Sequence, residues 1–172
     1  MSSSQQQNEE KRRLANERQN AVRKAWKQER ERVQEGKGTR KWTLEQQKEM
    51  LDRGSVRGYE GHHMKSVSLY PEYAGEPKNI QFLTENEHLY GAHKGNYHNL
   101  TNGYYDADNQ TMVEFNGNEI RDVPEFDLQN QEDDELNTVL NNEYDDTKTQ
   151  ETVINNSQDR TISKSNNQEV SR

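Results

Sequence analysis

The apolar residues of this chain are concentrated in one stretch, and this limits how much of the chain can pack around a core. Of the 172 residues, 27% are hydrophobic and 31% are charged, whereas an ordinary soluble domain is about 45–50% apolar with glycine counted. The side chains that can form a core lie between residues 42 and 105: Trp42, Leu44, Met50, Leu51, Tyr59, Met64, Val67, Leu69, Tyr70, Ile80, Phe82, Leu83, Leu89 and Tyr90. We therefore expect one small folded domain, preceded by an arm and followed by a tail.

Charge divides the chain into three segments. Residues 1–58 carry 15 Lys+Arg against 9 Asp+Glu, residues 59–106 carry 3 against 6, and residues 107–172 carry 5 against 16. The segment charges are therefore +6, −3 and −11, which together give the net charge of −8. The basic segment, residues 1–58, can approach a polyanion, whereas the acidic segment, residues 107–172, cannot. The net charge of the whole chain therefore says little about its partners.

The front of the chain is expected to be helical. Residues 9–35 contain neither proline nor glycine and are rich in Glu, Lys, Arg, Gln and Ala, which favour helix. The few apolar residues form one narrow stripe near helical spacing: Leu14, Val22, Trp26 and Val33. Such a stripe is suited to dock on a partner or on the later domain. We interpret residues 1–41 as a basic helical arm or linker with a solvated surface, and an arm that grips DNA is the alternative.

The back of the chain lacks the residues that fold. Residues 127–172 are mainly Asn, Gln, Asp, Glu, Ser and Thr, with Tyr144 as their one aromatic residue. Such a segment buries too little apolar surface to offset chain entropy, so we expect a disordered acidic tail. Residues 112–115, followed by Asn116 and Gly117, are typical of a short strand and turn. The folded domain is therefore expected over residues 42–126.

Two absences restrict the class of protein. The chain has no cysteine, so any metal site must be built from histidine and carboxylate. Its longest apolar run is far shorter than the ~18 residues of a membrane span, and its start, MSSSQQQNEEKRR, lacks the apolar stretch of a signal peptide. We expect a soluble protein without a membrane partner. It is either cytoplasmic or delivered into a target cell without a cleavable signal peptide.

The histidines are clustered. All five lie between residues 62 and 98, a window of 37 residues inside the expected core. Around the first pair, Gly58 and Gly61 interrupt a short extended segment. Adjacent residues of a strand point to opposite sides, so His62 and His63 are expected to have different roles. His98 is interpreted as a surface histidine.

A second strand and a helix are expected to follow. Residues 79–83 favour a strand, and Thr84 with Glu87 fits a capping box that begins a helix. His88 would lie in the first turns of this helix. In a regular helix, His93 would point about 140° away from His88.

The expected order of elements is strand, loop, strand and helix. The first strand carries His-His, the second begins at Asn79, and His88 follows nine residues later. This arrangement resembles the ββα-metal motif of the HNH nucleases. Two sequence segments resemble the GHH-type toxins of the HNH/endonuclease VII superfamily, which are domains of bacterial polymorphic toxins: GYEGHHMKSV and PKNIQFLTENEHLYGAHKGN. The resemblance covers about residues 42–106. It implies an α+β fold, a small ββα-metal core to which this chain adds the basic N-terminal helix and the acidic tail.

The resemblance also implies residue roles. His62 and His88 would be metal ligands, His63 the general base, and Asn79 the residue that orients this base. Glu60 matches an acidic residue that would support the ligands from outside the metal shell. Phosphodiester hydrolysis needs such a base and positive charge on the developing oxyanion, and imidazole titrates near neutral pH.

His93 is where the chain departs from the pattern. Members with three histidine ligands place the third four residues after the helix histidine, where this chain has Ala92. His93 would be a third ligand if the helix is distorted near Gly91. A regular helix leaves a site with His62 and His88 alone, and this two-ligand site is the preferred reading.

The function expected from these residues is metal-dependent endonuclease activity with little sequence specificity. The divalent ion would be Mg²⁺, Zn²⁺, Ni²⁺ or Mn²⁺, the substrate DNA or, as second choice, RNA, and the protein a bacterial toxin or effector with a cognate immunity protein. A phosphate track is expected along the basic front and four further residues: Trp42, Lys65, Lys78 and Lys94. The start at Met1 favours an independent protein, whereas the basic helix resembles a connector in a larger toxin.

The main alternative is a non-catalytic module in which a metal only staples the domain for binding nucleic acid or protein. A structural site is usually closed by four protein ligands, often cysteines, and this chain has none. A nuclease inhibitor that mimics DNA through its acidic tail is a third reading, but it leaves the histidines without a role.

Overall fold

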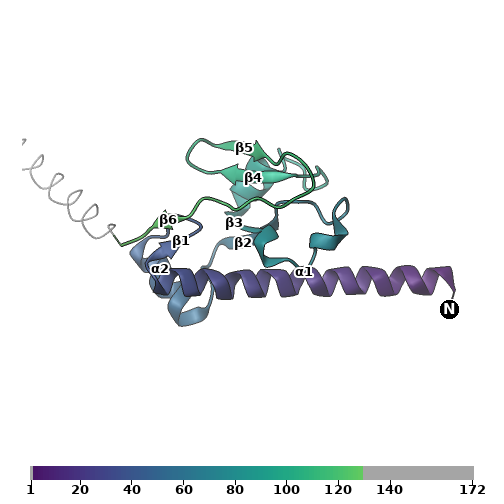
Figure 1. Ribbon diagram of the computed structural model, residues 1–172, viewed down its shortest axis with the longest axis horizontal. Coiled ribbons are helices and arrows are strands. Elements are labelled where there is room, and N and C mark those ends of the chain that lie inside the picture. The colour runs from purple at the N-terminus through teal and green to yellow at the C-terminus, as the bar shows by residue number, and fades with distance from the viewer. Residues whose placement is uncertain (1, 130–172) are drawn as a thin grey trace, which may run out of the picture. The chain divides into compact units, whose positions relative to one another are not determined.

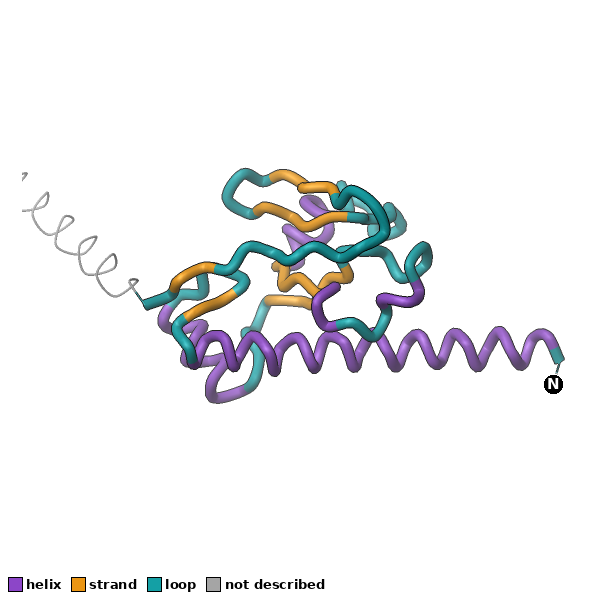
Figure 2. The backbone as a smooth tube through the Cα atoms, in the orientation of Figure 1, coloured by secondary structure: helices purple, strands orange, loops and turns teal. Residues whose placement is uncertain are grey.

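The computed structural model describes residues 2–129, which form a mixed α and β fold with three separate two-stranded sheets (Figure 1). The path of the chain can be followed in Figure 2. The elements in chain order are α1 (Ser3–Gln34), β1 (Lys37–Gly38), α2 (Leu44–Arg53), β2 (Tyr59–His63), η1 (Pro71–Tyr73), η2 (Pro77–Asn79), β3 (Ile80–Thr84), η3 (Glu87–Ala92), β4 (Gly103–Asp106), β5 (Thr111–Glu114) and β6 (Phe126–Asp127).

All three strand pairs are antiparallel. β2 pairs with β3, so that His62 lies opposite Gln81 and His63 opposite Ile80. β4 pairs with β5, and β1 pairs with β6. The expected order of strand, loop, strand and helix is therefore present in β2, β3 and η3.

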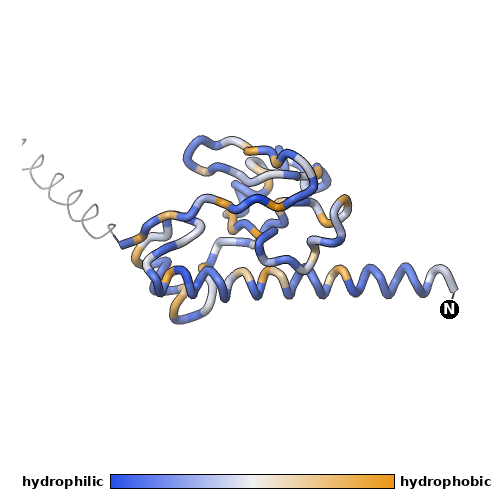
Figure 3. The backbone as a smooth tube through the Cα atoms, in the orientation of Figure 1, coloured by the Kyte–Doolittle hydropathy of each residue, from blue (hydrophilic) through white to orange (hydrophobic). Residues whose placement is uncertain are grey.

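Helix α1 contributes directly to the main core. Ala21, Ala25 and Val33 are buried in the same cluster as Trp42, and Trp26 stacks on a ring of β3 with the centroids 3.8 Å apart. Residues 1–41 were expected to be a basic helical arm or linker; in the structure, α1 is instead a wall of the domain. Small alanines allow this close packing, although the apolar stripe is narrow and most residues of the helix are hydrophilic (Figure 3).

A buried carboxylate joins α1 to the start of the domain. Glu29 is fully buried, and its Oε1 accepts hydrogen bonds from the Trp42 indole at 2.7 Å and from the Thr39 backbone N–H at 2.6 Å. Arg32 lies 3.2 Å from its other oxygen. A buried charge is tolerated when it is paired and hydrogen-bonded in this way, so Glu29 fixes α1 against the chain that follows it.

The last described residues return to the same core. β6 pairs with β1, and Leu128 is buried among the residues of the main cluster. The described fold thus continues past residue 126, where the sequence analysis placed the end of the domain. The rest of the expected tail, residues 130–172, lies outside the described residues. Within residues 2–129, no helix has both the length and the apolar character to cross a membrane.

Candidate metal centre

Gly61 allows α1 to lie directly against the strand that carries the histidines. A Cβ atom at this position would lie 2.7 Å from Cγ2 of Val22 and 3.2 Å from Cγ2 of Ile80. Real Cβ atoms essentially never approach a neighbour as closely as the first of these distances. The glycine of the Gly-His-His sequence is therefore required by the contact between β2 and α1, which brings the helix beside His62 and His63.

Three histidines from separate elements meet beside this strand. His62 comes from β2, His88 from η3, and His93 directly follows η3. Their ring centroids are 4.9 to 5.0 Å apart, and one nitrogen of each lies within 4.8 Å of the other two. This group could hold a metal ion.

The prediction of a regular helix after Thr84 is wrong, because the helix is of the π type. The backbone N–H of His93 donates to the carbonyl oxygen of His88, five residues earlier, at 3.0 Å. A π turn takes up one more residue than an α turn, so residues five apart come to the same side. Ala92, four residues after His88, is instead buried in a second apolar cluster with Tyr105.

The helix is distorted at Gly91. A Cβ at Gly91 would lie 2.6 Å from the ring of Tyr105, so the helix and β4 approach closely at this point. The preference for a two-histidine site depended on a regular helix, and that premise fails. The alternative geometry, in which His93 reaches the other histidines, is the one observed.

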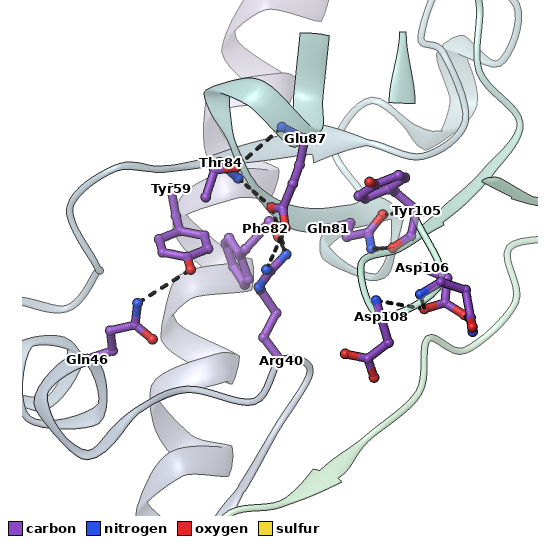
Figure 4. Close-up of polar contacts among 11 residues, drawn as sticks. Arg40, Gln46, Tyr59, Gln81, Phe82, Thr84, Glu87, Tyr105, Asp106 and Asp108 are labelled. Carbon is purple, nitrogen blue, oxygen red and sulfur yellow. Dashed lines mark hydrogen bonds and ion pairs between the residues drawn. The ribbon is translucent and has the colours of Figure 1, made fainter. Parts of the chain in front are cut away.

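The turn that leads into this π helix is fixed by the predicted capping box. Glu87 accepts a hydrogen bond from the Thr84 N–H at 2.8 Å, and the Thr84 hydroxyl accepts one from the Glu87 N–H at 3.3 Å. Arg40 donates to both Glu87 carboxylate oxygens, at 2.9 and 3.0 Å, and to the Phe82 carbonyl (Figure 4). This bidentate pair ties the segment before Trp42 to the turn that carries His88.

Hydrogen bonds orient two of the three rings. Nδ1 of His88 lies 3.0 Å from a carboxylate oxygen of Glu60, and Nδ1 of His93 lies 2.7 Å from the carbonyl oxygen of Asn99. Both oxygens are acceptors, so each Nδ1 carries a proton, and in the neutral form of each ring Nε2 has the lone pair. Such partners of the non-ligating nitrogen are usual at histidine metal sites.

His62 supplies the strongest indication that this group of histidines fits a metal ion. Its Nε2 is buried and has no hydrogen-bond partner within residues 2–129. An unsatisfied buried nitrogen costs about 1–3 kcal/mol. Burial, followed by the charges of the neighbouring histidines, lowers the pKa of His62 well below its usual value. The ring is therefore neutral, which is the form that binds metals, and the three histidines fit a divalent ion.

His63 lies next to this group but faces a different partner. Its Nε2 is 3.0 Å from the Ala74 carbonyl oxygen, so Nε2 donates and Nδ1 keeps the lone pair. Burial lowers the pKa of His63, the charge of Arg18 lowers it further, and the bond to Ala74 opposes both. A neutral imidazole with a free Nδ1 is suited to accept a proton near neutral pH.

Asn79 bridges the backbone segments around His63. Its fully buried side chain accepts from the Lys65 N–H at 2.8 Å and donates to the carbonyl oxygens of Lys65 and Tyr73, at 3.0 and 3.4 Å. Lys65 follows His63 by two residues, and Tyr73 precedes the Ala74 carbonyl that His63 contacts. Asn79 thus holds both sides of the His63 hydrogen bond through the main chain.

The four histidines line one pocket of about 730 Å³. Its other walls come from α1, from residues 66–68, and from Tyr97, Asn99 and Leu100. Among the residues that sequence reasoning missed is Tyr97, whose ring lies 5.2 Å from that of His88. No motif marks this residue. Arg18 and Arg23 belong to the basic front on which a phosphate track was expected, but no motif singled out these two residues as lining the pocket.

The expected phosphate track is only partly present. Trp42 and Lys65 are fully buried, and Lys65 is held by the side chain of Asn102 and the carbonyl of Gly117, so neither can contact a substrate. Lys78 and Lys94 are exposed but do not line the histidine pocket.

Comparison with known proteins agrees with the resemblance drawn from the sequence. Residues 8–84 match a family model described as a GHH signature containing HNH/Endo VII superfamily nuclease toxin. The match confirms the resemblance, begins within α1 and includes Glu60, His62, His63 and Asn79. It ends before His88, so the π helix lies outside the matched range.

The chain is also similar to teneurins. It is 43% identical over 81 residues to Teneurin-3 of Mus musculus, 42% over 71 residues to Teneurin-4 of Homo sapiens, and 36% over 63 residues to Teneurin-m of Drosophila melanogaster. These alignments cover 46%, 41% and 36% of this chain but only 3%, 3% and 2% of the relatives. The chain thus spans about 3% of the length of the relatives it matches.

Proposed function

We propose that this protein is a metal-dependent endonuclease that hydrolyses phosphodiester bonds, with DNA as its first substrate and RNA as the second choice. One observation carries the proposal. Three histidine rings meet beside a fourth, and the nitrogens left free by hydrogen bonding are those that a metal site and a general base need. The nuclease family matched by residues 8–84 supports the same activity.

His62, His88 and His93 would hold the ion. Three imidazole ligands favour a transition ion such as Zn²⁺, Ni²⁺ or Mn²⁺ over Mg²⁺, which prefers oxygen ligands. Three protein ligands also leave a position open, as in catalytic rather than structural zinc sites. When bound, the ion supplies positive charge beside the phosphate and the leaving oxygen.

His63 would act as the general base. Its Nδ1 takes a proton from the water that attacks the phosphorus, while a new P–O bond forms and the bond to the leaving sugar oxygen breaks. The Ala74 carbonyl holds Nε2–H and stabilises the imidazolium that results. Because its pKa is lowered, the ring is in the basic form at neutral pH.

Three further groups would keep the rings in position. Glu60 and the Asn99 carbonyl hold Nδ1 of His88 and His93, so that each Nε2 turns toward His62. Asn79 acts on the His63 side through the main chain. These are positioning residues, since no reacting atom would touch them.

The matched family is described as a nuclease toxin. We therefore propose that the protein acts against a target cell, and that a cognate immunity protein blocks it in the producing cell. The three relatives come from animals, so they add no support for a bacterial origin.

Supercoiled plasmid provides the direct test. The purified protein is treated with chelator and assayed alone and after addition of Zn²⁺, Ni²⁺, Mn²⁺ or Mg²⁺. We expect nicking only after a transition ion is restored. His63→Ala, loaded with the same ion, is the control for a contaminating nuclease. Metal binding by the wild type without cleavage of plasmid or structured RNA would instead support a non-catalytic metal-stapled module.

A further inference from the structure

Helix α1 forms one side of the histidine pocket. Four of its residues line the pocket: Arg18, Gln19, Val22 and Arg23. The contact between Val22 and Gly61 holds this part of the helix against β2. The side chains one turn before Val22 and directly after it therefore stand at the pocket as a consequence of the fold.

The two arginines at the pocket lack a negative partner. Arg18 is exposed and makes no hydrogen bond or ion pair with residues 2–129. Arg23 is exposed and donates only to the neutral amide oxygen of Asn20. Elsewhere on the same helix, Arg13 and Arg32 are each paired with two glutamates. Arg18 and Arg23 therefore stand at the pocket with their positive charge available to a ligand.

We propose that Arg18 and Arg23 bind backbone phosphates of the nucleic-acid substrate, so that α1 is the phosphate-binding wall of the site. The proposal rests on the nuclease function proposed above. A guanidinium presents planar donors that match two phosphate oxygens at once. The arginines are five residues apart, about 7.5 Å along the helix axis, which allows them to contact separate phosphates.

Other residues that line the pocket have a different character. Tyr97 and Leu100 are half exposed or more, at 50% and 56%. Neither carries charge at neutral pH, so neither offers the phosphates an ionic partner. Arg18 and Arg23 are the only arginines or lysines among the described residues that line the pocket, so the nucleic-acid backbone is expected to lie against α1.

Lys24 provides a matched control within the same helix. It follows Arg23 directly, is exposed, makes no ion pair with the described residues, and does not line the pocket. One residue turns the helix by about 100°, so Lys24 points away from the histidines. Lys24→Gln removes the same charge as Arg18→Gln or Arg23→Gln without touching the proposed wall.

Binding is measured apart from cleavage. Zinc-loaded protein carrying His63→Ala is titrated into a fluorescein-labelled DNA duplex of about 20 base pairs, and fluorescence anisotropy is followed at several KCl concentrations. We expect Arg18→Gln and Arg23→Gln each to weaken binding about 5- to 10-fold and to reduce the salt slope by about 0.9. Lys24→Gln should change the affinity less than about twofold, and Arg18→Lys should retain part of it.

Cleavage by the same variants with His63 intact separates this inference from the proposed function. We expect KM to rise for both arginine variants while kcat changes little. Equal effects of all three glutamine variants, or none, in a protein that still cuts DNA would overturn the phosphate wall and leave the nuclease standing. Failure of the wild type to bind or cut both the DNA duplex and a matching RNA duplex would overturn both. Preference for RNA would keep the arginine roles and change the substrate.

Discussion

The backbone N–H of His93 donates to the carbonyl oxygen of His88 across five residues, and this π-helical geometry brings both imidazoles beside His62. A regular helix would have separated the two rings by about 140°. Turns of this type are rare and often occur at functional sites. The departure from regular helix geometry is therefore the feature on which a three-histidine centre depends.

His93→Ala should lose metal about as severely as His88→Ala. Replacing a group that only supports a ligand costs about 10- to 100-fold in metal affinity, so removing a ligand itself should cost about 100-fold or more. Competition with a chromogenic zinc chelator measures both affinities. His98→Ala is the control, because this histidine does not line the pocket. A His93→Ala protein with near wild-type affinity would restore the two-ligand model.

His63→Ala should lose cleavage while keeping the metal. A positioned general base contributes about 10²- to 10⁴-fold, so kcat for plasmid nicking should fall within this range. Zinc affinity should change little, because Nε2 of His63 contacts Ala74 rather than the three-histidine group. Quantitative gel analysis of nicking, with chelator competition on the same samples, checks both parts. Cutting at the wild-type rate would show that another group takes the proton.

The local patterns of the sequence were enough to predict the strands around the histidines and the capping box of Thr84 and Glu87, because these depend on neighbouring residues. The apolar stripe of α1 indicated that the helix docks, but the surface on which it packs was not predicted. This stripe is narrow, and the contact of Val22 with Gly61 joins residues 39 positions apart, which no local pattern contains. The sequence left the orientation of His93 between two alternatives for a related reason, because the close approach of Gly91 to the ring of Tyr105 is a contact between distant residues.

Gly61→Ala should destabilise the domain through its contact with α1. The new methyl group would lie 2.7 Å from Val22, and overpacking of this kind costs typically about 1–3 kcal/mol. Thermal unfolding followed by circular dichroism should show a lower Tm. Gly75→Ala is the control, because its nearest neighbour would be 3.6 Å away, an ordinary contact. Adding Val22→Ala to Gly61→Ala should recover part of the loss, and no recovery would place the strain elsewhere.

The ion pair of Arg40 and Glu87 should make the stability of the domain depend on pH in the acid range. Partial burial alone would raise the pKa of Glu87, but the hydrogen bonds from Arg40 and Thr84 outweigh it and lower the pKa. A carboxyl group whose pKa is lower in the folded state stabilises the fold above its unfolded pKa, about 4.3. This contribution is lost as the pH falls through the folded value.

Glu87→Gln tests this linkage because it keeps the shape of the side chain and removes the charge. Chemical denaturation at pH 7 and at steps below pH 5 gives the free energy of unfolding for both proteins. We expect the variant to be less stable at pH 7, since the partly buried Arg40 loses its charged partner. The difference between the two proteins should shrink as the pH falls below about 4.3. Glu85→Gln is the control, because Glu85 is exposed and makes no ion pair with residues 2–129. A stability difference that stays constant from pH 7 into this acid range would show that Glu87 contributes through its shape rather than through its charge.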